Sequence, residues 1–194
     1  VYEFLLNKYP NYNKVEFEKK LNSLVDKSDD YKDLMSELTN LFNPNFDDNI
    51  QNHYKFYEKH IFFKFIIYSI NTKLINNKYS KIYDFAINEI KEPLKILEIG
   101  GGMPHGLIFN VWKKGKLFCN KLNYVDADLL HSEFVDWYCK KNEIPLEIKL
   151  FPAAKTPEIE GIEYNFVFAK DIFEHLDAPE KLIDDLIANT TNSK

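Results

Sequence analysis

The second half of this 194-residue chain is predicted to be an α/β domain built on a mostly parallel sheet. The run Leu94–Ile99 is almost continuously apolar, as in a central parallel strand that is covered on both faces. A second strand-like run, residues 121–128, follows at the distance of one crossover helix. A third run begins at Tyr164 and leads through a polar loop into a helix entered at Pro179.

Three glycines, Gly100–Gly102, end the first strand and remove side chains where a ligand must come close. Pro104 suits the first position of a helix, because its ring already holds the required backbone angle. A helix N-terminus is therefore predicted to face the turn. His105 stands where a dinucleotide fingerprint needs its third glycine, and no Walker-type Lys-Ser or Lys-Thr pair follows.

The acid before the glycines narrows the choice of ligand. Glu98 would repel a pyrophosphate, but it would accept a charge-assisted hydrogen bond from an ammonium group, directly or through water. A cationic, nucleoside-containing cofactor is the expected ligand. The alternative is a tight strand-to-helix turn that binds nothing.

Two more acids lie at the end of the second strand. Asp126 follows Gly102 by 24 residues, and a carboxylate at that strand tip can accept hydrogen bonds from vicinal ribose hydroxyls. Asp128 is expected to cap the following helix, although either aspartate could be simply a cap. Apolar residues recur at helical spacing after it: Leu130, Phe134, Trp137 and Tyr138.

Glu98, Gly100 and Gly102 resemble motif I of the class I S-adenosylmethionine-dependent methyltransferases, where an acid-x-Gly-x-Gly pattern closes the first strand. The family usually has another glycine where this chain has Pro104. Asp126 falls on the family's ribose-binding acid. Residues 164–179 resemble its fourth-strand region, whose loop often contains Glu-His-Leu and then a proline, although Asn165 replaces the usual aspartate.

The resemblance covers residues 94–187 and implies a Rossmann-like, doubly wound sheet with strand order 3-2-1-4-5-7-6. It implies S-adenosylmethionine as the cofactor. Residues 145–150 would supply the third strand, and Phe151 after it is the candidate for apolar stacking on adenine. His105 could touch the cofactor's carboxylate or face solvent. The expected cofactor-binding residues are Glu98, Gly100, Gly101, Gly102, His105, Asp126, Asp128 and Phe151.

The implied chemistry is in-line methyl transfer, with the methyl group held about 3 Å from the acceptor atom. A base to remove the acceptor's proton is sometimes needed. His175 is the first candidate, because histidine is the side chain whose ordinary pKa, about 6.5, lies closest to neutral pH. Asp171 and Glu174 are alternatives, and Glu174 and His175 could instead satisfy backbone groups of their loop. No metal site is predicted.

Residues 1–92 differ in composition from the rest of the chain: they are rich in Tyr, Phe, Asn and Lys and contain no glycine. We expect an all-helical region there, followed by the cofactor-binding domain at 93–194. Family resemblance implies that these helices lie on the lid and substrate side. Helices are predicted within residues 15–25, 34–42, 48–74 and 80–90. The third carries an aromatic stripe, typical of core packing, and two histidines, His53 and His60, whose spacing is a weak metal signal.

Composition limits the partners. The chain has 25 Lys and Arg against 30 Asp and Glu, a net charge of −5, which argues against a broad nucleic-acid surface. For the methyltransferase that the resemblance implies, we expect a small-molecule or glycan acceptor. The distant cysteines Cys119 and Cys139 suggest neither disulfide nor zinc, and a cytoplasmic location is expected. The most apolar stretch, 61–70, is too short to span a membrane.

Four of the family's seven strands can be assigned before Lys194. The fourth strand would then be an open apolar edge, which soluble proteins normally cover. We expect either that the chain is a fragment of a longer protein, the stronger interpretation, or that a partner or second copy completes the sheet. Two other functions stay open: a methyltransferase-like binding subunit without catalysis and, more weakly, a NAD-dependent oxidoreductase.

Overall fold

The computed structural model describes residues 2–11, 13–16, 18–19, 80–102, 119–170 and 172–191. The chain divides into two compact units, residues 1–74 and 75–194. In the first unit, helix α1 spans Tyr2–Lys8. Asn13 Oδ1 accepts hydrogen bonds from the N–H groups of Val15 and Glu16 at a later helical turn. The rest of the predicted helix 15–25 beyond residue 19, the helices at 34–42 and 48–74, the aromatic stripe, His53 and His60 all lie outside the described residues.

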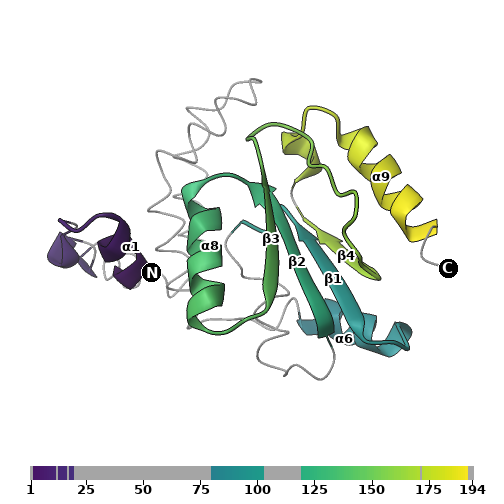
Figure 1. Cartoon of the computed structure of the whole chain (residues 1–194), viewed down its shortest axis with the longest axis horizontal. Helices are drawn as coiled ribbons and strands as arrows, with labels where there is room; N and C mark the ends of the chain where they lie inside the picture. The colour runs from purple at the N-terminus through teal and green to yellow at the C-terminus, as the bar shows by residue number, and fades with distance from the viewer. Residues whose placement is uncertain are drawn as a thin grey trace. The chain divides into compact units, whose positions relative to one another are not determined.

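A four-stranded, all-parallel sheet forms the centre of the second unit (Figure 1). Its strands are β1 (Leu94–Ile99), β2 (Cys119–Ala127), β3 (Leu146–Phe151) and β4 (Phe166–Ala169). They lie in the order β3-β2-β1-β4. The prediction of an α/β fold with a parallel sheet is confirmed. The order reverses at β1, because β2 and β3 lie on one side of it and β4 on the other.

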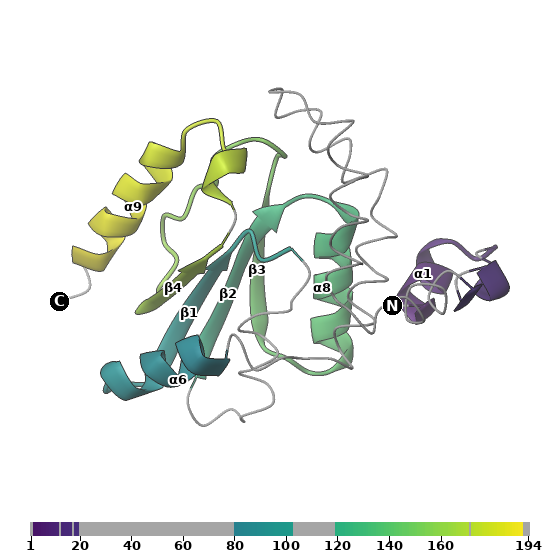
Figure 2. The same cartoon turned by 180° about the vertical axis from the view of Figure 1, so that it is seen from behind.

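Helices flank this sheet. They are α6 (Ser80–Glu89), α8 (Leu130–Lys141) and α9 (Pro179–Thr191), with a short 3-10 helix, η3 (Phe173–His175), before α9. Figures 1 and 2 draw α8 on the β3 side of the sheet and α9 on the β4 side, with α6 near the strands' amino ends. The helix start predicted at Pro179 is confirmed.

The predicted cap of α8 is wrong. Leu129, not Asp128, occupies the N-cap position, and it makes no side-chain hydrogen bond. The Asp128 N–H donates instead to the carbonyl of Phe151 at the end of β3, 2.9 Å away. This bond keeps Asp128 with the strand ends, and α8 begins only at Leu130.

One face of the sheet carries the apolar core that α6 and α8 cover. Its buried members are Ala86, Leu94, Ile96, Leu122, Tyr124, Val135, Cys139 and Ile144. Because side chains alternate along a strand, Glu98 of β1 and Asp126 of β2 belong to this same face. Both acids therefore continue the core toward the carboxyl ends of the strands, where Glu98 is paired in register with Tyr124.

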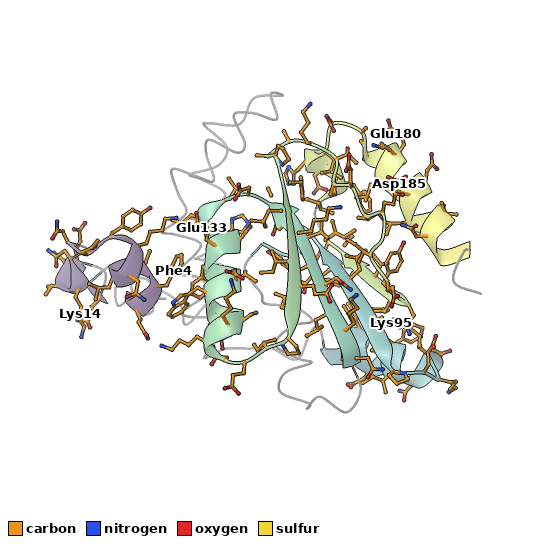
Figure 3. The ribbon with its side chains drawn as sticks, viewed as in Figure 1. Phe4, Lys14, Lys95, Glu133, Glu180 and Asp185 are labelled. Carbon is orange, nitrogen blue, oxygen red and sulfur yellow. The ribbon has the colours of Figure 1, made fainter. Side chains whose placement is uncertain are left out.

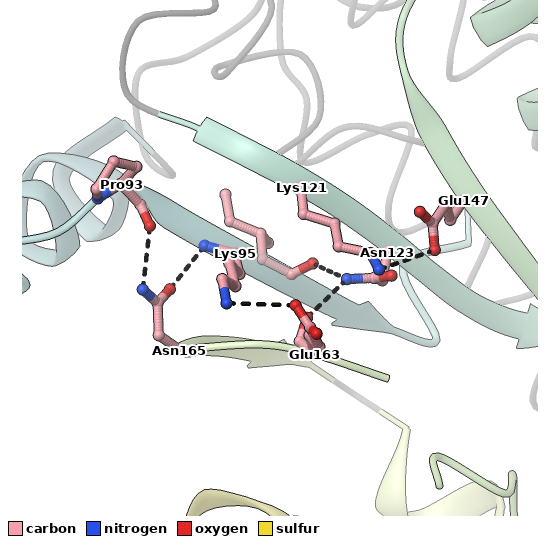
Figure 4. A network of polar contacts seen from close by, with 8 residues as sticks. Pro93, Lys95, Lys121, Asn123, Glu147, Glu163 and Asn165 are labelled. Carbon is pink, nitrogen blue, oxygen red and sulfur yellow. Dashed lines mark hydrogen bonds and ion pairs between the residues drawn. The ribbon is translucent and has the colours of Figure 1, made fainter. Parts of the chain in front are cut away.

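Side-chain amides join the strands toward their amino ends (Figure 4). Asn165, just before β4, accepts a hydrogen bond from Lys95 N at 2.7 Å and donates one to Pro93 O at 3.1 Å. Asn123 donates to the carbonyls of Ile96 and Glu163. Figure 3 also places Lys95 at this end of the sheet. These bonds fix the strand register at the end opposite the glycine turn.

Within the described part of the chain, no helix combines the length and apolar character needed to cross a membrane. Cys119 and Cys139 are both free thiols, and Cys139 is buried.

Candidate functional site

The last glycine of the turn is held on both sides of its backbone by β2. Gly102 N–H donates to Asp126 Oδ2 at 2.9 Å, and the Tyr124 hydroxyl lies 2.5 Å from Gly102 O. The same hydroxyl also contacts Asp126 Oδ2, so its single proton is shared between two acceptors. Tyr124 and Asp126 are two residues apart and thus point to one face of the strand. The end of β2 thereby sets the position of the turn that follows β1.

Asp126 is almost entirely enclosed by protein, with 5% of its surface exposed. Its Oδ1 accepts the N–H of Ala127 at 2.7 Å, while Oδ2 also lies 3.4 Å from His131 Nε2 in α8. Burial acts to raise the pKa of Asp126, but His131, the Tyr124 hydroxyl and the Ala127 N–H together lower it below its ordinary value. The carboxylate is therefore stabilised in its charged form.

The three positions of the turn favour glycine for different reasons. A Cβ on Gly100 would lie 2.5 Å from the side chain of Ile172, and one on Gly101 would lie 2.6 Å from Glu98 Oε1. A Cβ on Gly102 would meet no described atom within 4 Å, although its φ of +60° is a left-handed backbone angle that favours glycine. The turn is thus packed against protein at Gly100 and Gly101, while no atom of the described residues would lie against a Cβ on Gly102.

Two carboxylates give this site a negative character. Glu98, 1% exposed, bends toward Gly101, and its register partner on β2 is Tyr124. Burial raises the pKa of Tyr124 well above its usual value, and the nearby charges of Asp126 and Glu98 raise it further. The phenol therefore stays neutral and acts as a donor. Buried acids at a glycine turn oppose phosphate binding and favour a cationic group.

Loops after β1 and β4 meet at this site. Ile172, which lies against Gly100, is three residues beyond the end of β4, and its carbonyl accepts the His175 N–H at 2.9 Å. The contact brings η3, with the half-buried His175 and the exposed Glu174, near the turn. By the general rule for open α/β sheets, ligands bind where the strand order reverses, here between β1 and β4.

Other predicted site residues lie in different places. Asp128 is exposed just beyond β2, next to the buried Asp126. Phe151 pairs in register with Ala127 and is 6% exposed, so its ring belongs to the sheet face opposite Glu98 and Asp126. His105 and Asp171 lie outside the described residues. The turn therefore gathers Glu98, Gly100, Gly101, Gly102 and Asp126, whereas Phe151 faces away from them.

A second set of contacts joins the loop after β3 to the start of α9. Asp177 accepts hydrogen bonds from the N–H and hydroxyl of Thr156, both at 2.8 Å, and pairs with Lys155 at 3.0 Å. Thr156 Oγ1 in turn accepts the Ala178 N–H at 3.0 Å. The hydrogen bonds from Lys155 and Thr156 lower the pKa of Asp177 to about 2. These contacts hold two loops that follow strand ends.

Comparison with known proteins does not identify the chain. No family model, no curated protein and no solved structure matches it. Among the residues that the structure describes, no three His, Cys, Asp or Glu side chains are grouped as a metal site. A function for this chain is therefore inferred from its own residues and from the motifs that they resemble.

Sequence reasoning missed three residues that build the site: Tyr124, His131 and Ile172. A signal existed for Tyr124, because it precedes Asp126 by two residues in a predicted strand and must share its face. His131 in the first turn of α8 is 3% exposed, and its burial beside Asp126 depends on helix packing. The role of Ile172 becomes visible only in the structure, where the loop after β4 lies against the glycine turn after β1.

Proposed function

We propose that this chain binds S-adenosylmethionine at the glycine turn and transfers its methyl group to a small-molecule or glycan acceptor. The observation that carries the proposal is the 2.9 Å hydrogen bond between Gly102 N and Asp126 Oδ2. It joins the glycine turn after β1 to the acid at the end of β2. These are the two segments whose motifs resemble the cofactor site of class I methyltransferases.

The position of the turn in the sheet supports a ligand site. Strand order β3-β2-β1-β4 reverses at β1, and the turn leaves β1 at its carboxyl end. Ile172, from the loop after β4, closes the turn at Gly100. Ligands of open parallel sheets occupy this location for a geometric reason, because adjacent loops diverge from a reversal point and leave space between them.

The charges at the turn fit the proposed cofactor. Glu98 and Asp126 place two buried carboxylates beside the glycines, and a carboxylate can accept hydrogen bonds from an ammonium group. At Gly102, where a Cβ would contact no described atom outside its chain neighbours, backbone without a side chain can approach a ligand. A pyrophosphate would meet like charge here, which disfavours a nicotinamide dinucleotide.

When bound, S-adenosylmethionine supplies a methyl group on a sulfonium that is a good leaving group. We assign Glu98 and the glycines to holding the cofactor, and the exposed Asp128 to its hydroxyl groups, because the carboxylate of Asp126 is already engaged with the turn. His175, Glu174 and Asp171 are the proposed candidates for removing a proton from the acceptor. His175 is favoured, since Ile172 anchors its short helix beside the turn.

Isothermal titration calorimetry on the full chain tests the cofactor. S-adenosylmethionine is expected to bind and NAD is not. Glu98→Gln is expected to weaken binding about tenfold, the scale of one charge-assisted hydrogen bond. Glu147→Gln is the matched control, because Glu147 pairs with Lys121 toward the amino end of β3 and loses the same charge away from the turn (Figure 4). Binding of NAD alone would refute the proposal.

Turnover separates an enzyme from a binding subunit. Production of S-adenosylhomocysteine is measured with panels of small-molecule and glycan acceptors. We expect product formation that falls in His175→Ala while cofactor affinity is kept. Tight cofactor binding without turnover on any acceptor would instead support a binding subunit, the second function that the motifs allow.

A further inference from the structure

His131 is a buried imidazole with an unusual environment. It lies in the first turn of α8, is 3% exposed, and its Nε2 lies 3.4 Å from Asp126 Oδ2. Among the described residues, neither Nδ1 nor Nε2 has a hydrogen-bond partner. Burying an unpaired ring nitrogen costs free energy, so an aliphatic residue would serve the packing of α8 better. The position of this histidine is explained by its partner and not by the core.

That partner has little capacity left for anything outside the protein. A carboxylate offers about four acceptor sites, two on each oxygen. Asp126 Oδ2 already faces the Gly102 N–H, the Tyr124 hydroxyl and His131 Nε2, and Oδ1 accepts the Ala127 N–H. Asp126 cannot accept two ligand hydroxyls through both oxygens while it also holds the turn.

We infer that His131 is a positioning residue for the glycine turn, acting through the Asp126 carboxylate, which orients the peptide of Gly102. His131 Nε2 faces Oδ2 at 3.4 Å, the distance of an ion pair, and Oδ2 accepts the Gly102 N–H. The Tyr124 hydroxyl binds the carbonyl of the same residue. The identity of the ligand at this turn rests on the proposed function. The positioning of the turn by His131 and Asp126 does not depend on that function.

Nuclear magnetic resonance on the full chain without ligand tests the arrangement. The readouts are the amide proton of Gly102, its exchange with solvent and the titration of the Asp126 carboxyl. In His131→Leu we expect the Gly102 amide to exchange at least tenfold faster and the pKa of Asp126 to rise, because burial raises it and the His131 contribution is lost. His131→Gln should restore the slow exchange of the Gly102 amide, because its side chain can donate toward Oδ2, but only part of the lowering of the Asp126 pKa, because it carries no charge.

The Asp126 carboxyl titrates within a cluster that contains other titratable groups. The other titratable groups of this cluster are Glu98 on β1, Tyr124 on β2 and Cys139 on α8. The charges of Asp126, Glu98 and Cys139 all raise the pKa of Tyr124. Unchanged amide exchange and Asp126 titration in a folded His131→Leu would overturn the inference. So would a His131→Gln variant that behaves like His131→Leu.

A measurement on the unsubstituted protein covers the case in which His131→Leu does not fold. The nitrogen chemical shifts of His131 report which ring atom carries the proton. We expect a proton on Nε2, the ring nitrogen that faces Asp126. A neutral ring protonated on Nδ1 alone would contradict the inference.

Calorimetry with S-adenosylmethionine links the arrangement to binding. His131→Leu should weaken binding about tenfold, and Asp136→Asn should leave it unchanged, because Asp136 pairs with Lys140 on the outer side of the same helix. Unaltered affinity in His131→Leu, with the turn perturbed, would overturn the functional part of the inference. If the unsubstituted chain bound no S-adenosylmethionine, the proposed function would fail, whereas the measurements without ligand would still decide the role of His131.

Discussion

Gly102 N lies 2.9 Å from Asp126 Oδ2, although the two residues are 24 positions apart in the sequence. The bond connects the glycine turn after β1 to the carboxyl end of β2. The carboxylate of Asp126 at the end of β2 thus holds the glycine turn, and it would affect a ligand indirectly, through the position of the Gly102 backbone. Asp126 holds the turn, whereas the exposed Asp128 is proposed to contact the cofactor, so substitutions of the two acids should have distinct effects.

Asp126→Ala is expected to lower the free energy of unfolding by about 3 kcal/mol, because it leaves buried donors of Gly102 and Ala127 without an acceptor. It should also weaken cofactor binding by about 1–3 kcal/mol. Asp128→Ala should change stability by no more than about 0.5 kcal/mol, because its side chain is exposed, yet weaken binding to a similar degree.

Urea unfolding and calorimetry on the same two variants check this separation. The comparison fails if Asp128→Ala binds S-adenosylmethionine as tightly as the unsubstituted chain while Asp126→Ala is fully stable. That result would return the ribose contact to Asp126.

Gly100→Ala is expected to cost about 3 kcal/mol or more of stability, and Gly102→Ala only about 1 kcal/mol. Both carry positive φ, but of these two only a Cβ on Gly100 would clash with a described residue, 2.5 Å from Ile172. A double-mutant cycle of Gly100→Ala with Ile172→Ala measures the coupling by urea unfolding. Ile172→Ala should recover part of the loss, and strictly additive effects would show that the two residues do not touch.

Asn165→Asp is expected to lower stability by about 1 kcal/mol at pH 7. A carboxylate can still accept from Lys95 N, but it cannot donate to Pro93 O, 3.1 Å away. The loss should shrink as pH falls toward 4, because a protonated carboxyl regains a donor. Unfolding curves from pH 4 to 7 test this, with Glu163→Gln as a neighbouring control. A deficit that does not vary with pH would contradict the hydrogen-bond account.

Asp177 gives the chain a defined sensitivity to acid. Its pKa is lowered to about 2 by Lys155 and Thr156, so its contribution to stability is present above its ordinary pKa near 4 and is lost as pH falls toward 2. The stability advantage of the unsubstituted chain over Asp177→Asn should therefore disappear between pH 4 and 2. Because the pair is exposed, 1 M salt should reduce that advantage. An advantage that persists at pH 2 would exclude this ion pair as its source.

The sheet was largely predictable because its signals are local. Apolar runs that end in turn residues predicted the strands, and the spacing between Gly102 and Asp126 correctly placed an acid beside the glycine turn. Pro179 also began a helix as predicted, because proline is favoured at that position.

The remaining features depend on contacts between distant segments. Which face Phe151 occupies is set by the register of β3 against β2, which strand periodicity alone does not fix. Asp128 failed as a cap because its N–H bonds the end of β3. The burial of His131 depends on how α8 packs over β2, and the role of Ile172 depends on the meeting of two loops.

One calorimetric comparison tests the cofactor site most directly. S-adenosylmethionine is titrated into the unsubstituted chain, Gly102→Ala and Gly161→Ala. Gly161 is a matched control away from the turn, since it also has a positive φ and a Cβ at this position would meet no described atom within 4 Å. We predict equal small losses of stability in both variants, and loss of binding only in Gly102→Ala. Equal binding by all three proteins, or binding by none, would contradict a cofactor site at the glycine turn.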